Sequence, residues 1–451
     1  MQTSVIAARS RVSPILASSG RHWTLKRWHF WLLVLGLLLR VAYSLTVDKE
    51  SSFAGLDGKE YLAYAQSLLS LHGDDYPRFF NDIRPPGYPF FLMPFVEFGS
   101  SVVWPIQLFQ CVIGTFLAIV LAKIAGRWCG QRAGDFACAL VLVHPFLIYF
   151  CAYVMTETLF MALLWLGVAC LQAFDARVHK NAGRALFAAA VILAFACLTR
   201  PTLQPFLPVA AAWLAWRGWR GNGWRRGLKV AAQFTVVVSA LLLPWMIRNF
   251  EKHHSWSLAP GSGEAAYASA NSLKYLTLHE AKSKAEYYAI QDQIVAAISV
   301  ESGESEQDWL QSARDFRQNH PREWLRLQWL KFRHFWTPWL NPLIFSKRDF
   351  LLSLVSATPL FLLAAAEFVR RRKRWDDPLL VLLSALILVG YLVGGLIFHV
   401  QVRYRIPFVD IAFLLLAASL LAQLVNQLHR YKSVHSTLLR TQGRTASTEC
   451  V

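Results

Sequence analysis

Residues 378–399 read PLLVLLSALILVGYLVGGLIFH and contain no Asp, Glu, Lys or Arg. A helix rises 1.5 Å per residue, so this run would be about 33 Å long, enough to cross the ~30 Å hydrocarbon core of a bilayer. The stretch therefore predicts a transmembrane helix. The whole composition agrees, because 55% of the 451 residues are hydrophobic and the mean hydropathy is +0.34. These values exclude a soluble globular protein.

Apolar runs of comparable length recur along the chain, and together they predict an all-α membrane protein with about ten transmembrane helices. The polar break between the fifth and sixth runs is only TRPT, so the boundary at 199–203 is the least defined. The predicted spans are 29–47, 102–125, 134–151, 155–174, 184–199, 203–217, 228–247, 350–369, 378–399 and 406–427.

Basic residues mark alternate connections between these spans. They occur in the N-terminal arm, in the loops near 127–132, 177–184, 217–229 and 370–374, and in the C-terminal tail, all on one side of ten spans. The positive-inside rule makes this side the cytoplasm. The net charge of +18 is therefore a topology signal, and it does not indicate a nucleic-acid partner.

Arg40 interrupts a long first apolar run, which favours an uncleaved anchor over a signal peptide.

The same topology divides the chain into five parts. The parts are a cytoplasmic basic arm at 1–28, a seven-span part at 29–247 with an outer loop at 48–101, an outer helical loop at 248–349, a three-span part at 350–427, and a cytoplasmic tail at 428–451 that is predicted to be disordered.

The outer loop at 248–349 is about a hundred residues long, too long for a bare connection. We expect a helix at 279–300, a second helix opened by a capping box at Ser305–Asp308, and a third with Pro321 as its first residue. The segment 321–339 mixes Trp with Arg and Lys, which is typical of a helix lying at the membrane interface.

The outer loop at 48–101 is the acidic part of a basic protein, and its residues 58–71 predict an amphipathic surface helix that includes Tyr61. Asp57 stands immediately before this helix. It is interpreted either as an N-cap, with Glu60 completing a capping box, or as a carboxylate that activates an acceptor hydroxyl at the mouth of a membrane cavity. The two interpretations are compatible.

Residues 83–91, IRPPGYPFF, follow in the same loop. Two prolines fix the backbone, so Arg84 would stand on a stiff strut that includes Pro86. Gly87 would permit a turn or a close approach, and Tyr88 with the two phenylalanines would anchor the segment at the interface. Arg84 could then snorkel to lipid phosphates, or its guanidinium could hold a bound lipid phosphate in a bidentate manner.

Further ionisable residues recur at the outer ends of later spans. Each alone is typical of a snorkelling end or an anchor. Several of them on one face, beside an acidic loop, indicate a site for an anionic lipid and a nucleophile. These residues are Glu157 in TETLF, Arg200 in LTRP, Arg248 in PWMIRN, and Arg403 and Arg405 in RYRIP.

Taken in order, Asp57 with Tyr61, RPPGYP, TETLF, LTRP, PWMIRN and RYRIP resemble the polytopic GT-C glycosyltransferases over the whole transmembrane chain. Within them the chain resembles the bacterial branch that is similar to protein O-mannosyltransferases and to lipid A aminoarabinose transferases. The resemblance implies a polyprenyl-phosphate sugar as donor, inversion at the anomeric carbon, Asp57 as the catalytic carboxylate, and arginines that hold the donor phosphate. Two departures are Gly58, where some relatives have an acidic residue, and the lack of a large soluble module.

A single displacement is therefore expected, with Asp57 and Glu157 as catalytic residues. The donor phosphate would be bound by Arg84, Arg200, Arg248, Arg403 and Arg405. These side chains would be positioned by Tyr61, Pro86, Gly87 and Tyr88. The expected partners are the donor, membrane lipids and an unidentified hydroxyl acceptor, at the periplasmic face of a bacterial inner membrane. No cofactor is indicated, and Asp74–Asp75 reads as a solvated loop, so no paired-carboxylate motif supports a divalent metal. A transporter or flippase of lipid-linked sugars and a surface-polysaccharide polymerase or ligase are alternatives.

Overall fold

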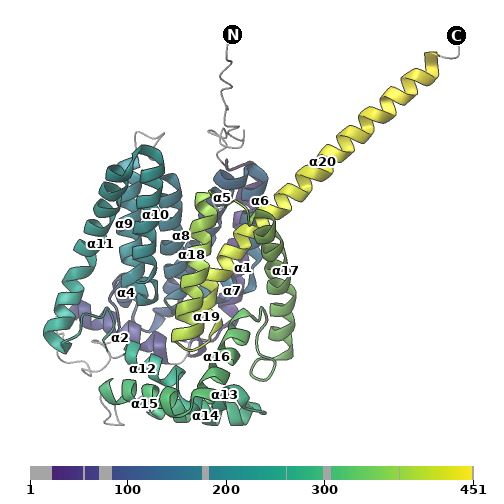
Figure 1. The fold of residues 1–451 in the computed structure, drawn as a ribbon. Coiled ribbons are helices and arrows are strands. Elements are labelled where there is room, and N and C mark those ends of the chain that lie inside the picture. Colours follow the sequence, from purple (N-terminus) through teal and green to yellow (C-terminus); the bar gives the residue numbers. More distant parts are fainter. Residues whose placement is uncertain are drawn as a thin grey trace.

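A computed structural model describes residues 23–53, 56–70, 84–174, 182–260, 262–297, 306–374 and 376–448. Every regular element in these ranges is helical, which confirms the all-α prediction. The long helices form one bundle, and a layer of shorter helices covers one of its ends (Figure 1). We call that end the outer end, as the sequence predicts, and the opposite end the inner end.

Seven helical segments of the described chain are long and apolar enough to span a membrane. An eighth span is formed if the bent pair at 131–152 crosses as one segment. The seven are α1 (Arg27–Thr46), α5 (Val103–Cys129), α9 (Ala182–Thr199), α11 (Trp224–His253), α17 (Lys347–Arg371), α18 (Pro378–Tyr391) continued by the π-helical turn η7 (Leu392–Ile397), and α19 (Val402–Arg405) joined through η8 (Ile406–Asp410) to α20 (Ile411–Thr448).

The predicted count of ten is therefore not confirmed, although each predicted span coincides with a helix. Two of the segments, α8 (Glu157–Ala173) and α10 (Phe206–Asn222), have only 17 residues each. A third is broken, because α6 (Gln131–Val143) meets α7 (Pro145–Tyr149) and η4 (Phe150–Ala152) at an angle of 58°. Pro145 lacks the backbone N–H needed to continue α6, which explains the break.

Arg40 of the neighbouring helix α1 stabilises this break with hydrogen bonds. Its side chain is fully buried, and it donates hydrogen bonds of 3.0 Å to the carbonyl oxygens of Val141 and Leu142 at the end of α6. A third bond of 3.0 Å reaches Gly36 on α1. Carbonyls freed by a broken helix must find donors in an apolar surrounding, so a buried arginine stabilises the bend.

The outer layer is built from both predicted outer loops. The first loop gives η2 (Ser51–Phe53), α2 (Leu56–Ser70), α4 (Gly87–Val96) and η3 (Gly99–Ser101). The second gives α12 (Ser262–Ala270), α13 (Leu273–Glu280), α14 (Lys284–Ala297), α15 (Glu306–Asn319) and α16 (Pro321–Trp336).

Several details of these loops can be compared with the sequence. Pro321 opens α16 as predicted, and the helix expected at 279–300 is the shorter α14. Ser305 lies outside the described residues, as does the Asp74–Asp75 pair.

Close packing of η7 brings the last spans against the outer layer. A Cβ added at Gly394 would lie 2.8 Å from the Cβ atom of Tyr404 on α19, and one at Gly395 would lie 3.2 Å from the Phe335 ring on α16. Larger residues would separate these elements. The glycines of GYLVGG thus fix where the chain turns back at residues 397–402.

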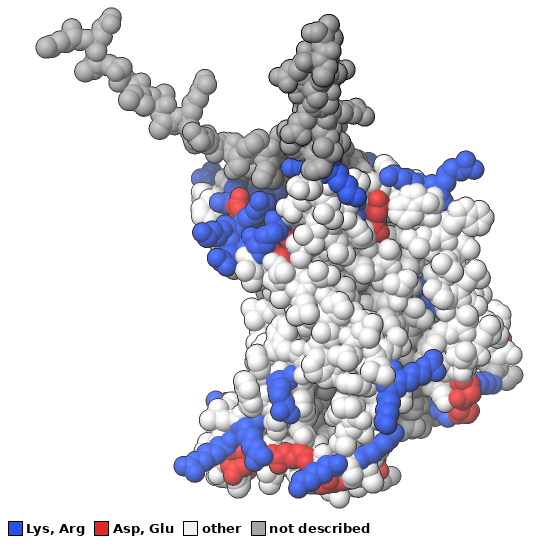
Figure 2. Space-filling view, turned by 90° about the vertical axis from the view of Figure 1, so that its right-hand side faces the viewer, with Lys and Arg blue, Asp and Glu red and all other residues white. Residues whose placement is uncertain are grey.

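An apolar band separates the two charged ends of the molecule on the side that carries α17 and α20 (Figure 2). The chain is an integral membrane protein with the described start of α1 and the end of α20 on the inner side (Figure 1). The C-terminal part differs from the prediction, because α20 continues as a helix to Thr448 where a disordered tail is expected after residue 427. Its continuous backbone hydrogen bonding extends the last span well past the bundle.

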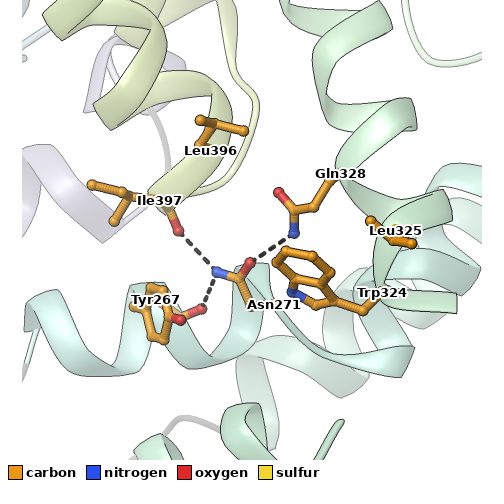
Figure 3. Close-up of a pocket in the computed structure, with 7 residues that line it drawn as sticks. All are labelled: Tyr267, Asn271, Trp324, Leu325, Gln328, Leu396 and Ile397. Carbon is orange, nitrogen blue, oxygen red and sulfur yellow. Dashed lines mark hydrogen bonds between the residues drawn. The ribbon is translucent and has the colours of Figure 1, made fainter. Parts of the chain in front are cut away.

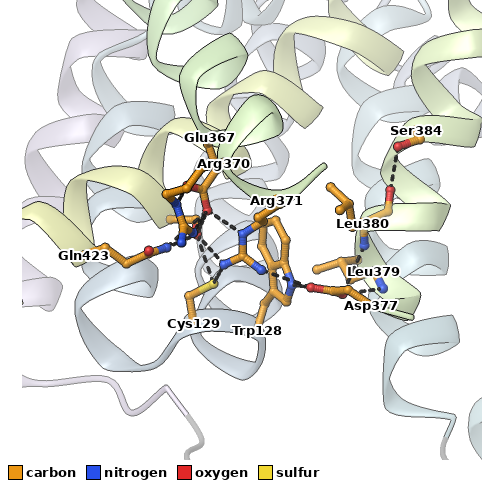
Figure 4. A network of polar contacts seen from close by, with 11 residues as sticks. Trp128, Cys129, Glu367, Arg370, Arg371, Asp377, Leu379, Leu380, Ser384 and Gln423 are labelled. Carbon is orange, nitrogen blue, oxygen red and sulfur yellow. Dashed lines mark hydrogen bonds and ion pairs between the residues drawn. The ribbon is translucent and has the colours of Figure 1, made fainter. Parts of the chain in front are cut away.

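Near the inner end, a network of polar contacts ties α17 to its neighbours (Figure 4). Glu367 is fully buried, and its carboxylate pairs with Arg370 at 2.7 Å and Arg371 at 2.5 Å on the same helix. Ser419 and Gln423 of α20 donate to the same carboxylate at 2.6 and 3.1 Å. The network therefore joins the two helices at their inner ends.

Candidate active site

Six charged side chains from five separate segments meet at the outer end of the bundle. Three are carboxylates and three are arginines, so the formal charges of the cluster sum to zero. They come from α2, from the turn before α4, from the first residue of α8, from the residue after α9, and from α19. The cluster consists of Asp57, Glu60, Arg84, Glu157, Arg200 and Arg403.

Asp57 bridges two arginines that are far apart in the sequence. Its Oδ1 accepts from Nη2 of Arg84 at 2.8 Å, and its Oδ2 accepts from Nη1 of Arg403 at 3.0 Å. Burial raises the pKa of Asp57, but the guanidiniums of Arg403 and Arg84 outweigh this effect and hold the pKa below its usual value. The carboxylate is therefore an anion.

The N-cap interpretation of Asp57 is wrong. Helix α2 begins at Leu56, so Asp57 lies within its first turn, and both carboxylate oxygens face arginine side chains. Glu60 likewise binds Arg84 through Oε2, at 3.1 Å from Nε and 2.5 Å from Nη2, and does not complete a capping box at Asp57. Tertiary contacts have replaced the local capping that the sequence allows.

The turn before α4 places Arg84 in the cluster. Pro86 directly precedes α4, and a Cβ added at Gly87 would lie 2.6 Å from the backbone nitrogen of Thr199, so only glycine allows the strut to touch the end of α9. The Arg84 guanidinium lies 5.2 Å from the ring centroid of Tyr61, which is itself almost buried. Rigid backbone and aromatic packing hold this guanidinium beside Asp57.

Glu157 and Arg200 form the buried floor of the cluster. Nη1 of Arg200 donates to Oε1 of Glu157 at 2.7 Å, and the two side chains are 7% and 1% exposed. Nε of Arg403 lies 3.6 Å from the same oxygen and has no hydrogen-bond partner in the described structure. Arg403 thus links this buried pair to Asp57.

The prediction that Tyr88 anchors the segment at the membrane interface is wrong. It is fully buried, and its hydroxyl donates to Oε1 of Gln110 at 3.0 Å. The Gln110 amide in turn donates to the carbonyl of Tyr153 at 2.7 Å, and Gln107 donates to that of Ala152 at 2.8 Å. These contacts fix the turn that leads into Glu157.

Sequence reasoning did not assign the two glutamines, although they carry a readable signal. They lie three residues apart within the apolar helix α5, where uncharged amides need partners. For Glu60 the local sequence indicates only a capping box. Its role beside Arg84 could not be read from local spacing, because the partners are 24 residues apart.

The other two predicted phosphate ligands, Arg405 and Arg248, lie on α19 and α11. Arg405 is buried and pairs with Asp410 at 2.8 Å. It also donates to carbonyls within 335–338, in the last turn of α16 and just after it. Arg248 stacks on Trp245 at 4.3 Å and donates to Asn249 at 2.9 Å, both on its own helix α11. The contacts of Arg405 are thus made outside the cluster.

The described residues do not form a metal site. No group of three His, Cys, Asp or Glu side chains in this part of the chain gathers in a way that could hold a metal ion. Asp57, Glu60 and Glu157 are each paired with arginine instead, which leaves few oxygens for a cation that needs several.

A pocket of about 320 Å³ lies in the outer layer where α12 and α16 meet η7 (Figure 3). Asn271 occupies its centre, donating to the carbonyls of Tyr267 and Ile397 and accepting from Gln328. None of the six cluster residues lines this pocket. The pocket therefore belongs to the covering layer and is separate from the charged cluster.

Comparisons with known proteins agree with this architecture. The family model of dolichyl-phosphate-mannose-protein mannosyltransferases matches residues 83–247, which include Arg84, Glu157 and Arg200. A comparison with curated proteins gives no match.

Solved structures with a similar fold come from the oligosaccharyltransferase of Archaeoglobus fulgidus. The AglB complex with an inhibitory peptide and a dolichol-phosphate has a TM-score of 0.53 and 13% identity, covering 91% of this chain and 52% of that chain. The structure tethered to an acceptor peptide with the NVT sequon has a TM-score of 0.54 and 13% identity, covering 91% and 51%. The chain thus spans about half the length of these structures. The predicted resemblance to GT-C glycosyltransferases is confirmed by the family model and the fold.

Proposed function

We propose that this protein is an inverting glycosyltransferase that moves a sugar from a polyprenyl-phosphate-linked donor to a hydroxyl group of an envelope acceptor. The observation that carries the proposal is the Asp57 carboxylate held between Arg84 and Arg403 at 2.8 and 3.0 Å. Such a carboxylate can orient and deprotonate a hydroxyl, and guanidiniums beside it can bind a phosphate. The GT-C fold and the family match support the same chemistry.

The reaction would be a single displacement. The acceptor oxygen attacks the anomeric carbon from the face opposite the phosphate, and its proton passes to Asp57. The bond between the anomeric carbon and the phosphate oxygen breaks, and the polyprenyl phosphate leaves with the electron pair. Because Asp57 has a lowered pKa, it accepts the proton only as the acceptor oxygen becomes acidic during attack.

The arginines would stabilise the leaving phosphate. Arg84 and Arg403 are partly exposed, at 23% and 28% of their side chains, whereas Arg200 is almost buried. Preorganised cations at a site of developing negative charge usually supply a large part of the rate enhancement. Glu157 would hold Arg200 and Arg403 in place for this role.

We further propose a bacterial inner membrane as the location, with the cluster on the periplasmic face. The acceptor would be a lipid, a polysaccharide or a protein of the envelope. The spacing of basic loops supports this orientation.

The test is a mass-spectrometric comparison of envelope glycolipids, polysaccharides and proteins. It uses a strain without the gene and the same strain complemented by wild type or Asp57→Asn. Loss of one sugar from one product class, restored by wild type but not by Asp57→Asn, is expected and would identify the acceptor. Restoration by Asp57→Asn would contradict a transferase. Accumulation of the untransported lipid-linked sugar on the inner side would instead indicate a flippase.

A further inference from the structure

The hydrogen bonds that Arg84 makes to two carboxylates leave few N–H groups for a further anion. A guanidinium has five N–H groups, one on Nε and two on each Nη. Glu60 accepts from Nε at 3.1 Å and from Nη2 at 2.5 Å. Asp57 accepts from Nη2 at 2.8 Å. Two carboxylates thus use three of the five groups, and only those on Nη1 have no acceptor among the described residues.

A phosphate bound in a bidentate manner needs two neighbouring N–H groups that point the same way. One such edge of Arg84, formed by Nε and Nη2, is already occupied by Glu60. The other edge is half occupied, because its Nη2 bond goes to Asp57. Arg84 therefore cannot hold a phosphate by two bonds while Glu60 stays in place.

Glu60 is the carboxylate of the cluster with the fewest partners. Asp57 is held by two arginines, and Glu157 is 1% exposed. Glu60 is 13% exposed, and within the described structure its hydrogen bonds and ion pairs run only to Arg84, through Oε2. The neighbouring Lys59 pairs with Glu50 instead, at 2.7 Å.

We propose that Glu60 is an internal counter-ion of Arg84 that a lipid phosphate displaces. The inference rests on the proposed function and adds a positioning residue to it. With no lipid bound, Glu60 neutralises Arg84 and keeps it beside Asp57. An incoming phosphate takes the Nε–Nη2 edge, and Glu60 swings toward solvent. After transfer, Glu60 competes for the same edge and speeds the release of the polyprenyl phosphate.

This exchange also accounts for selectivity. An uncharged lipid cannot displace a carboxylate from a guanidinium, whereas a phosphate can, because it offers equal or greater negative charge in a similar geometry. Glu60 would thus exclude neutral polyprenols and their neutral glycosides from the arginine. Removing its charge should tighten phosphate binding and slow product release.

The experiment measures binding of farnesyl phosphate, with farnesol as the uncharged control, to purified full-length protein in detergent. Glu60→Gln should tighten farnesyl phosphate binding by about tenfold, roughly the effect of removing one competing charge contact. Glu50→Gln is the matched control, because Glu50 is 76% exposed and pairs with Lys59. It should leave binding unchanged.

Arg84→Gln should weaken binding, and the double variant Glu60→Gln/Arg84→Gln should equal Arg84→Gln alone, because Glu60 acts through Arg84. In sugar transfer, Glu60→Gln should lower KM and kcat together, whereas a merely structural role would raise KM. If Glu60→Gln lowers the melting temperature, Glu60→Asp, whose side chain is one carbon shorter, should still tighten binding.

Two failures can be told apart. If wild type binds farnesyl phosphate no better than farnesol and Arg84→Gln has no effect, the proposed function fails, and this inference fails with it. If wild type binds the phosphate through Arg84 but neither Glu60 variant tightens it, only the counter-ion role is overturned.

Discussion

Two networks of arginines and carboxylates lie near opposite ends of the bundle, and they use their polar atoms to different extents. At the inner end, Arg371 donates to Glu367 at 2.5 Å, to Asp377 at 3.0 Å and to Ser419 at 3.0 Å, and its guanidinium stacks on Trp128 at 4.2 Å. Every nitrogen of Arg371 has a partner (Figure 4).

The outer cluster is open by comparison. Nη1 of Arg84 has no acceptor among the described residues, and Nε of Arg403 has no hydrogen-bond partner there. Asp57, Arg84 and Arg403 keep 27%, 23% and 28% of their side chains exposed. The same residue types therefore stabilise the fold where every side-chain nitrogen has a partner, and they can meet a ligand where some nitrogens have none.

The largest expected difference between the two ends concerns Asp57→Asn. We expect sugar transfer to fall by about 100-fold or more, as for loss of general-base assistance, while the lipid-linked donor still binds. The measurement is transfer and donor binding in nanodiscs, together with thermal melting. Asp377→Asn at the inner end is the matched control, because Asn can still cap α18, and it should keep its transfer rate. Equal transfer by wild type and Asp57→Asn would remove Asp57 from the chemistry.

For Glu367→Gln at the inner end we expect a loss of stability and no loss of sugar transfer. Arg370 and Arg371 would lose the buried carboxylate with which they pair. Breaking such a pair should lower the free energy of unfolding by about 3 kcal/mol. Transfer by the protein that remains folded should be normal. Thermal or denaturant unfolding in detergent measures this loss, and Glu97→Gln on the exposed surface is the control. A stable Glu367→Gln variant with impaired transfer would reverse the assignment of the two networks.

A smaller effect is expected from Arg84→Lys. Lysine keeps the positive charge but lacks the planar fork, so donor affinity should fall by about tenfold. Arg370→Lys, at a 37% exposed position of the inner network, should leave donor affinity unchanged. Titration of a fluorescent lipid-phosphate donor measures both variants. Unaltered affinity of Arg84→Lys would mean that Arg84 meets lipid only as a point charge.

The smallest expected effect is a pH dependence of the stability of the helical layer that covers the outer cluster. Burial, together with His334, Lys331, His399 and Arg333, lowers the pKa of His279 from 6.5 to about 3. Burial likewise lowers the pKa of His399 to about 4. The unfolded layer therefore binds protons at a higher pH than the folded layer does, and its stability should fall as pH drops from about 6.5 toward 4.

Hydrogen exchange of α13 and α16 at pH 7.5 and 5.0 measures this effect. Exchange should be faster at the lower pH, after correction for its intrinsic pH dependence. His279→Gln should reduce the difference, because one proton-binding group is removed. Identical protection at both pH values would show that these histidines do not limit the stability of the layer.

Much of the fold could be predicted because hydrophobicity is a local property. A run such as 378–399 must cross the membrane wherever it lies, and prolines such as Pro321 act on their own backbone. The close approach at Gly87 could be predicted for the same reason. The bend within the span at 131–152 could not be predicted, because Arg40 from another helix stabilises it.

The partners inside the site were decided by the tertiary structure. Arg403 and Arg405 stand two residues apart in RYRIP, and the sequence treats them alike. Residues two apart in a helix do not share a face, so packing sends Arg403 to Asp57 and Arg405 to Asp410. The sequence by itself determined a helical membrane protein with charges at one end. Which carboxylate meets which arginine across up to 346 residues was decided only when the helices packed.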